Sequence, residues 1–381
     1  MKRYCEKHIA EDLTKKMVFI GGPRQVGKTT LSKRLLQTKF RGGEYFNWDA
    51  DEDREAIRKK RWKSSSPLIV FDELHKFTHW KRWIKGVYDV RPEGQQYLVT
   101  GSARLDVYRR GGDSLMGRYH YWRLHPLTLD ELPRDVGSKE GYERLLKLGG
   151  FPEPFLSGDE REARRWRKER FDKVLREDVR DLENIRDIRL LQLFVDLLRT
   201  RVGGLITLSN LAEDLQISPK TAKAWLLLME RMYAVFAVYP YVKQMPRSIQ
   251  KPPKVYFYDN ADTADDEGMR LENLVATTLL KRLHYIEDFH GYRCSLHYVR
   301  DKDGHEVDFV TVIDGKVDEL IEVKHSDANI ATSLRYYADR IKHRAAVQIV
   351  GDLKRPFDTG GIHVTNPIAY FSKPLWVRES R

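Results

Sequence analysis

The sequence contains few cysteines and no long apolar run. Its 381 residues include two cysteines, Cys5 and Cys294, which lack the paired spacing of metal-binding or disulfide-bonded domains. This excludes a disulfide framework and a zinc ribbon, and it favours a reducing compartment. No apolar stretch approaches the roughly 18 residues of a transmembrane helix, and no signal peptide is expected. We therefore expect a cytoplasmic protein with no membrane contact.

Acidic residues are too few to balance the basic ones. The chain has 68 Lys and Arg residues against 56 Asp and Glu residues, which gives a formal net charge of +12 and a pI near 9.4. A basic surplus favours a polyanionic partner, most simply DNA, although many basic proteins bind none. The chain is longer than one hydrophobic core usually serves, so two or three domains are expected.

Residues 22–29 match the pattern G-x-x-x-x-G-K-[ST] at each fixed position. An apolar, strand-like stretch precedes them and a helical pattern follows, which is the context of a phosphate-binding loop. Glycines let such a loop wrap a phosphate, and the helix N-terminus faces the anion. We expect ATP as the ligand, with Lys28 on its β- and γ-phosphates and Thr29 on Mg²⁺. The predicted binding residues are Gly22, Pro23, Arg24, Gln25, Val26, Gly27, Lys28, Thr29 and Thr30.

A second apolar stretch, residues 67–71, ends in Asp72 and Glu73. This pattern indicates a buried parallel strand that brings both carboxylates to one edge of a sheet. Asp72 is predicted to hold Mg²⁺ through water, and Glu73 to polarise the attacking water. The alternative is a strand that ends in a solvated acidic turn. Another strand-like stretch, residues 44–48, lies between the two motifs, as in NTPases with an additional catalytic glutamate.

Two features further along concern the same reaction. Residues 95–102 indicate the next core strand, and Thr100 and Ser102 are candidates for contacting the γ-phosphate, although an ordinary strand-to-turn transition explains them equally well. Arg118 precedes a strand at 119–122 and is a candidate arginine finger, acting within its subunit or from a neighbour. A solvated surface arginine is the alternative. A finger from a neighbour predicts a homo-oligomer, of which a hexamer is one form.

The middle of the chain is predicted to be helical. Residues 151–206 form a highly charged helical connector, most simply with a solvated face. Residues 207–241 predict a helix-turn-helix with a wing, in which Ser218 caps the second helix and Pro219 opens it. If this element binds DNA, the residues facing the groove are Lys220, Thr221 and Lys223. Winged helices also serve as packing modules, so this alternative stays open.

The last part of the chain predicts a hairpin that carries two carboxylates and a lysine. Asp308 lies on one strand, and Glu322 and Lys324 lie on the same face of the next. Asp308 and Glu322 would bind Mg²⁺ or Mn²⁺ for phosphodiester hydrolysis, and Lys324 would position the water. Glu272, on the preceding helix, is a candidate third metal ligand. The alternative is a solvated hairpin with alternating charges.

In order along the chain, these motifs resemble those of bacterial and archaeal AAA-type ATPases with an uncharacterised, restriction-endonuclease-like (PD-(D/E)xK) C-terminal domain. The resemblance implies an AAA fold, ATP binding, a winged helix and a nuclease-like domain. It rests on residues 21–30, 71–76, 100–103, 115–118, 126–128, 149–152, 259–261, 272–273, 306–309 and 322–324.

We therefore expect a multidomain α/β protein. Its predicted parts are an AAA-type ATPase domain at residues 1–150, a helical connector at 151–206, a winged helix-turn-helix at 207–250 and a nuclease-like domain at 251–381. The expected function is ATP-driven nucleic-acid processing with metal-dependent DNA cleavage, in repair, branched-DNA processing or defence. The alternatives are a nucleotide-switched DNA-binding regulator that does not cut, and a signalling scaffold that binds ATP without turnover, which Glu73 disfavours.

Overall fold

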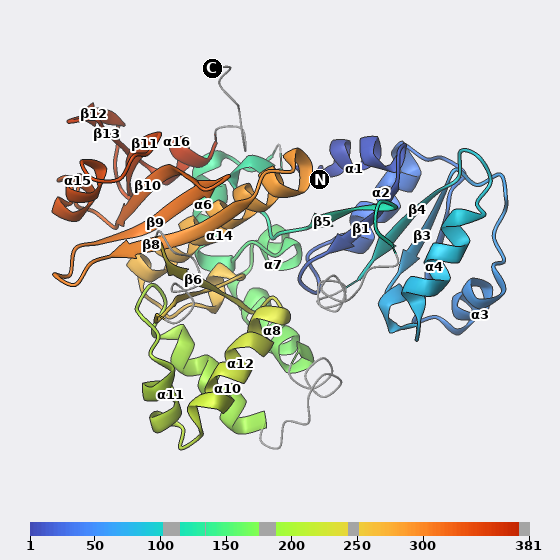
Figure 1. The fold of residues 1–381 in the computed structure, drawn as a ribbon, viewed down its shortest axis with the longest axis horizontal. Helices are drawn as coiled ribbons and strands as arrows, with labels where there is room; N and C mark the ends of the chain where they lie inside the picture. The colour runs from blue at the N-terminus through green and yellow to red at the C-terminus, as the bar shows by residue number, and fades with distance from the viewer. Residues whose placement is uncertain (102–114, 134, 175–187, 243–250, 373–381) are drawn as a thin grey trace. The chain divides into compact units, whose positions relative to one another are not determined.

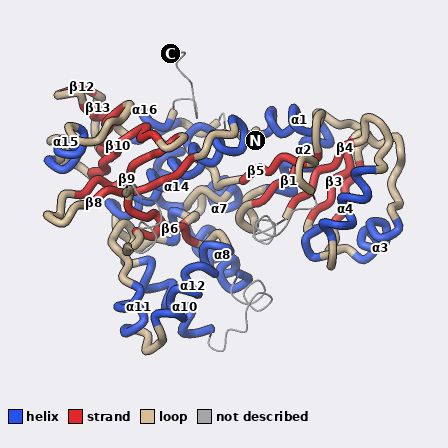
Figure 2. The backbone as a smooth tube through the Cα atoms, viewed as in Figure 1, coloured by secondary structure: helices blue, strands red, loops and turns tan. Residues whose placement is uncertain are grey.

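The computed structural model describes residues 1–101, 115–133, 135–174, 188–242 and 251–372. The chain divides into two compact units, Met1–His125 and Pro126–Arg381. Each unit contains its own sheet (Figures 1 and 2). Within the described residues, none of the helices has both the length and the apolar character needed to cross a membrane.

The first unit is built around a five-stranded parallel sheet in the order β2-β3-β4-β1-β5. β1 and β3 are buried along their whole length, because helices pack on both faces of a parallel sheet. Its elements are α1 (Glu6–Leu13), β1 (Met17–Gly21), α2 (Lys28–Thr38), β2 (Glu44–Asn47), α3 (Asp51–Lys59), β3 (Leu68–Asp72), η1 (Leu74–Lys76), α4 (Trp80–Asp89), β4 (Gln96–Thr100) and β5 (Tyr119–Arg123).

The strand order decides what lies beside the phosphate-binding motif. β4 lies between β1 and β3, whereas β2, the stretch that separates the two motifs in the sequence, forms the edge of the sheet. Because all five strands are parallel, the chain leaves β1 and β3 at the same edge. This places the glycine-rich loop and the Asp72–Glu73 pair at one end of the sheet.

The second unit contains an eight-stranded mixed sheet in the order β12-β13-β11-β10-β9-β8-β6-β7. The long helix α14 packs along β7 to β10, and α15 packs against β9, β10 and β11. Its strands are β6 (Val235–Pro240), β7 (Lys254–Phe257), β8 (Cys294–Arg300), β9 (Glu306–Ile313), β10 (Lys316–Lys324), β11 (Ala345–Val350), β12 (Phe357–Thr359) and β13 (Ile362–Thr365). Its helices are η2 (Leu129–Glu131), α6 (Ser138–Leu148), α7 (Pro152–Ser157), α8 (Glu160–Lys173), α10 (Ile188–Arg199), α11 (Leu208–Asp214), α12 (Pro219–Arg231), η4 (Asn260–Asp262), α14 (Glu267–His290), α15 (Thr332–Ala338) and α16 (Pro367–Phe371).

Residues 126–150 belong to the second unit, although the sequence places them in the ATPase domain. Buried Lys281 of α14 forms an ion pair with Glu131, and the side-chain amide of Asn260 donates to the carbonyl oxygen of Leu145 at 3.3 Å. These contacts join segments that lie more than a hundred residues apart in the chain, which local sequence patterns do not reveal.

Two helices, α11 and α12, lie where a helix-turn-helix is predicted. As predicted, Ser218 caps α12, since its hydroxyl accepts from the backbone N–H of Thr221 at 3.0 Å, and Pro219 opens the helix. The strand predicted as a wing is β6, which pairs with β7 on one side and with β8 on the other. The predicted boundary at residue 250 therefore falls between two paired strands of one sheet.

Candidate ATP site and carboxylate cluster

The glycine-rich loop follows β1 directly. Gly22 and Gly27 have positive φ angles of 139° and 97°, and a Cβ at Gly22 would collide with the carbonyl oxygen of Leu124. The Nζ of Lys28 donates to the carbonyl oxygens of Gly22 (3.0 Å) and Pro23 (2.6 Å), so the ammonium lies over the loop. A loop that only glycine can form, followed by α2 and covered by a lysine ammonium, suits the polyphosphate of ATP.

Asp72 accepts hydrogen bonds from three side chains. The hydroxyls of Thr29 and Tyr45 each donate to its Oδ2 at 2.6 Å, and Thr100 donates to its Oδ1. Burial would raise the pKa of Asp72, but the hydrogen bonds from Thr100, Thr29 and Tyr45 outweigh it and lower the pKa. The Asp72 carboxylate therefore stays ionised and lies beside the Thr29 hydroxyl. Asp72 and Thr29 are the pair that would hold Mg²⁺.

Glu73 lies beside this pair in a strained backbone conformation, with a φ of 57°. Its Oε2 is 3.6 Å from both His75 Nε2 and Lys76 Nζ. Burial raises the pKa of Glu73, although Lys28 and Lys76 oppose the shift. A carboxylate whose pKa is raised by burial at this edge of the sheet suits a proton acceptor for water.

Of the two residues predicted to contact the γ-phosphate, Thr100 and Ser102, the structure describes only Thr100. Thr100 points at Asp72 and helps to keep it ionised. Ser102 lies outside the described residues.

Arg118 lies at the opposite end of the sheet from the loop. β1 and β5 are parallel, with Met17 paired to Tyr119, so Arg118 precedes the first pair, whereas the loop leaves β1 after Gly21. Five strand residues separate these ends by about 16 Å. The Nε and Nη2 of Arg118 bind Asp89 Oδ1 and Oδ2 at 2.7 and 3.2 Å. This placement excludes action on its own loop, and it leaves two readings open, a surface arginine paired with Asp89 and a role towards a neighbouring subunit.

The residues predicted to contact DNA lie at the start of α12. Lys220 and Lys223 are exposed, while Ala222 and Trp225 of the same helix are buried. The backbone N–H of Thr221 is used in the Ser218 cap. Two exposed ammonium groups on one helical turn can contact a phosphate backbone.

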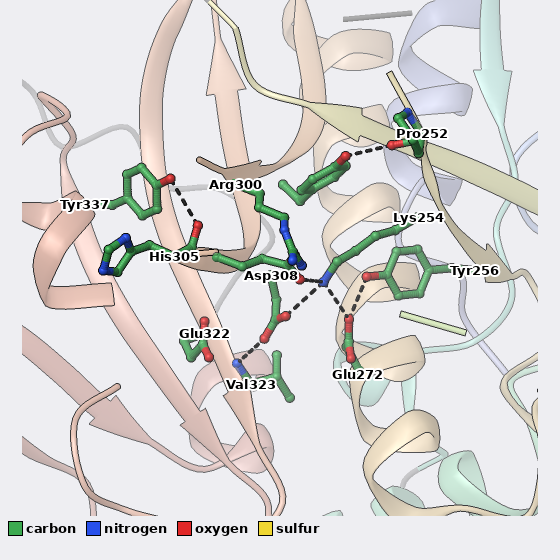
Figure 3. A network of polar contacts seen from close by, with 12 residues as sticks. Pro252, Lys254, Tyr256, Glu272, Arg300, His305, Asp308, Glu322, Val323 and Tyr337 are labelled. Carbon is green, nitrogen blue, oxygen red and sulfur yellow. Dashed lines mark hydrogen bonds and ion pairs between the residues drawn. The ribbon is translucent and has the colours of Figure 1, made fainter. Parts of the chain in front are cut away.

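Asp308, Glu322 and Lys324 come together on adjacent strands. β9 and β10 are antiparallel with Phe309 paired to Ile321, and the next pair in this register places Asp308 opposite Glu322 on one face. The Nζ of Lys324 lies 2.7 Å from Glu322 Oε1. The predicted trio is therefore assembled (Figure 3 shows Asp308 and Glu322).

Glu322 has one carboxylate oxygen without a hydrogen-bond partner. Its side chain is 6% exposed, and its buried Oε2 has no such partner within the described part of the chain. Burial and the nearby Asp308 raise the pKa of Glu322 to about 7. A desolvated oxygen beside a second carboxylate suits a hard cation, so Asp308 and Glu322 fit a divalent metal ion.

Glu272 does not fit its predicted role as a third metal ligand. Its Oε1 accepts from the Tyr256 hydroxyl at 2.7 Å and lies 3.5 Å from Lys254 Nζ (Figure 3). Across the described ranges, no group of three or more His, Cys, Asp and Glu side chains is arranged to hold a metal ion. Lys254, which contacts Glu272, enters from β7, a strand whose pairing the sequence pattern does not specify.

Sequence reasoning also missed Lys254, Tyr256 and Tyr45 as site residues. Lys254 and Tyr256 were recognised only as parts of a strand, and Tyr45 only as part of the stretch between the two ATPase motifs. One signal for Lys254 was available, namely a lysine in a short, otherwise apolar strand, because a buried lysine needs charged partners.

Three family models match successive parts of the chain. Residues 14–133 match an AAA domain, residues 139–261 match a domain of unknown function (DUF8612), and residues 267–370 match another domain of unknown function (DUF4143). The first match covers the glycine-rich loop, the Asp72–Glu73 pair and all five parallel strands. Residues 14–133 are therefore similar to an AAA domain. The DUF8612 and DUF4143 models describe domains of unknown function, so these two matches indicate no activity for residues 139–261 and 267–370.

Curated relatives of the chain are themselves uncharacterised. A Mycobacterium tuberculosis protein is 26% identical over 247 residues, which cover 64% of this chain and 54% of that protein. The match therefore spans about half the length of the mycobacterial relative. A Methanocaldococcus jannaschii protein is 24% identical over 362 residues, 86% of this chain and 79% of the relative.

Solved structures include a distant neighbour of the chain. The Thermotoga maritima RuvB Holliday junction branch migration motor is 17% identical and covers 61% of this chain and 87% of its own, with a TM-score of 0.30. That score is too low to equate the two folds.

Proposed function

We propose that the AAA domain hydrolyses ATP and that the second unit cleaves DNA with the help of a divalent cation. The observation that carries the first half is the hydrogen bond from Thr29 to ionised Asp72, with Glu73 next in the chain. The second half is supported by Asp308, Glu322 and Lys324 on adjacent strands. The low cysteine content, two residues in 381, suits the cytoplasm as the site of this activity.

The residues of the AAA domain divide the work of hydrolysis. Lys28 binds the β- and γ-phosphates, and Thr29 and Asp72 would hold Mg²⁺, which when bound neutralises charge on those phosphates. Glu73 orients the attacking water and takes up its proton, for which a pKa raised by burial is suited. Arg118 would act on the ATP of a neighbouring subunit, which requires an oligomer such as a hexamer.

In the second unit, Asp308 and Glu322 would hold Mg²⁺ or Mn²⁺, which when bound polarises the scissile phosphate. Lys324, 2.7 Å from Glu322 and 38% exposed, orients the attacking water and offsets the negative charge that develops on the phosphate. Exposed Lys220 and Lys223 on α12 would bind the DNA backbone.

A second candidate function is a nucleotide-switched DNA-binding protein that does not cut. It is favoured by Lys254, whose ammonium already neutralises part of the carboxylate cluster. The two proposals share the AAA domain and differ only in the role of Asp308, Glu322 and Lys324.

One set of reactions tests both halves. The full-length protein is incubated with single-stranded, duplex and branched DNA, with Mg²⁺ or Mn²⁺ and with or without ATP, while phosphate release and strand scission are recorded. Lys28→Ala should lose ATP affinity or turnover. Glu73→Gln should bind ATP but hardly hydrolyse it, because an amide cannot accept the proton.

Asp308→Ala should abolish scission and leave ATP turnover largely intact, since the two sites lie in different units. Wild-type turnover in both AAA-domain variants would contradict the first half. DNA binding without scission under any metal would favour the second candidate function.

A further inference from the structure

Lys254 is an internal cation within a group of three carboxylates. Its side chain is 2% exposed, and its Nζ lies 2.8 Å from Glu306 Oε1, 3.0 Å from Asp308 Oδ1 and 3.5 Å from Glu272 Oε1 (Figure 3). We call Lys254, Glu272, Glu306 and Asp308 the lysine–carboxylate cluster. Its members come from β7, α14 and β9, so the cluster ties three elements of the second unit together.

The ammonium stays charged despite its burial. Burial alone would lower the pKa of Lys254, but Asp308, Glu272 and Glu306 outweigh it and raise the pKa above its usual value. A positive group surrounded by carboxylate oxygens takes the place that a metal ion occupies in other acidic sites.

The Glu272 side chain is 20% exposed, and its carboxylate has neighbours on two sides. Oε1 accepts from the Tyr256 hydroxyl, and Oε2 faces the backbone of Gly203, where a Cβ would stand 2.5 Å from it. Gly203 has a φ of 74°, so glycine suits this close approach. A second cation at Glu272 Oε1 would have to displace both Lys254 and the Tyr256 hydroxyl.

The carboxylates around Asp308 outnumber the cations by one. The cluster and its neighbours contain four carboxylates, since Glu322 adjoins Asp308. They also contain three cations, because Arg300 lies 2.8 Å from Glu306 and Lys324 lies 2.7 Å from Glu322. One formal negative charge is uncompensated, and among the described residues Glu322 Oε2 has no hydrogen-bond partner. In Figure 3, Glu322 and Glu272 lie on opposite sides of Asp308.

We propose that Lys254 permanently substitutes for one divalent cation, so that the second unit accepts at most one, held by Asp308 and Glu322. Lys254 is then a positioning residue, which holds Asp308 from one side while the cation binds from the other. The inference takes its metal site from the proposed cleavage function, but the substitution by Lys254 can be tested without cleavage.

The test counts bound Mn²⁺ by electron paramagnetic resonance on nucleotide-free, full-length protein. The number of Mn²⁺ ions bound at the cluster is the difference in Mn²⁺ content between each protein and the same protein with Asp308→Asn added. This difference should be one ion for wild type. It should be two ions for Lys254→Met, because removal of the ammonium opens a second position. Lys251→Met, which removes an exposed lysine from the segment before β7, should match wild type.

Thermal unfolding provides the second measurement. In EDTA, Lys254→Met should melt roughly 10 °C below wild type, because three carboxylates lose their shared cation. Mn²⁺ should restore most of this loss, whereas it should shift wild type and Lys251→Met much less.

Three outcomes would overturn the inference. The first is that wild type binds two Mn²⁺ ions that depend on Asp308. The second is that wild type and Lys254→Met bind the same number of such ions. The third is that Lys254→Met stays unfolded in the presence of Mn²⁺. If wild type binds no such ion and Lys254→Met binds one, the substitution stands and the proposed cleavage function fails.

Discussion

Asp259 is a fully buried carboxylate between β7 and η4, where it caps η4. Its Oδ1 accepts from the backbone N–H of Ala261 at 3.3 Å, and its Oδ2 lies 3.6 Å from Arg170 Nη1. Burial and then the nearby Asp262 raise the pKa of Asp259 to about 7, although Arg170 opposes the shift. The residue therefore links the stability of the second unit to pH.

The direction of this link follows from proton binding. An unfolded Asp has a pKa near 3.9, so between about pH 4 and pH 7 the folded protein holds a proton that the unfolded chain has lost. The free energy of unfolding should therefore fall as the pH rises through this window, at up to about 1.4 kcal/mol per pH unit. Above about pH 7 this contribution should level off.

Asp259→Asn should flatten this part of the stability profile, since the amide keeps the acceptor for Ala261 and does not ionise. Urea unfolding at pH 5, 6, 7 and 8 measures the slope, with Asp339→Asn at an exposed position as the control. A slope for Asp259→Asn equal to that of wild type would show that another group is responsible.

Among the elements, the N-terminal end of β5 and the end of α4 define a surface away from the ATP loop. Arg118 and Asp89 bind each other there through two pairs of atoms, at 2.7 and 3.2 Å. The pair is exposed, so it contributes little to stability. An exposed arginine at this end of a parallel sheet can still meet the loop of a second subunit.

Arg118→Ala should lower ATP turnover by up to about 10³-fold if the arginine completes a neighbour's site. Mixing it with Glu73→Gln should restore some turnover, because mixed interfaces combine an intact Glu73 with an intact Arg118. Phosphate release across mixing ratios measures the effect. Asp89→Asn weakens the same pair but keeps the arginine, so it serves as the control.

If Asp89→Asn lowers ATP turnover as much as Arg118→Ala does, the effect comes from the ion pair between Arg118 and Asp89 within one subunit. A fully active monomer would contradict any role between subunits.

On the scale of the whole molecule, the proposed DNA binding rests on the formal net charge of +12 and on the helix pair α11 and α12. Charge on its own predicts only that polyanions are attracted. Exposed Lys220 and Lys223, at the N-terminal end of α12, offer a specific place for that attraction.

DNA binding should weaken with salt, with a slope of log K against log salt of about −0.9 per phosphate contact on duplex DNA. Lys220→Ala and Lys223→Ala should each reduce the slope by about 0.9 if each lysine makes one contact. Fluorescence anisotropy at several salt concentrations measures this, with exposed Lys354→Ala as the control. Salt-independent binding, or none at low salt, would remove DNA as a partner.

Local patterns in the sequence were sufficient for the ATP site and for the hairpin. The loop, the buried strand before Asp72 and the capped start of α12 depend on neighbours within a few residues, and the structure contains them as predicted. Asp308 and Glu322 could also be paired from the sequence, because a tight hairpin and the two-residue period of a strand determine which side chains share a face.

Only the tertiary structure decided which groups meet across long stretches of chain. Lys254 reaches Asp308 from 54 residues away because β7 pairs with β6 at the edge of the sheet, and Lys281 reaches Glu131 from 150 residues away. It also placed Arg118 at the end of the sheet opposite the loop, since strand order and direction, not spacing along the chain, determine that distance. Side-chain chemistry can be predicted from local sequence, whereas the neutralisation of a buried charge depends on which strands and helices pack together.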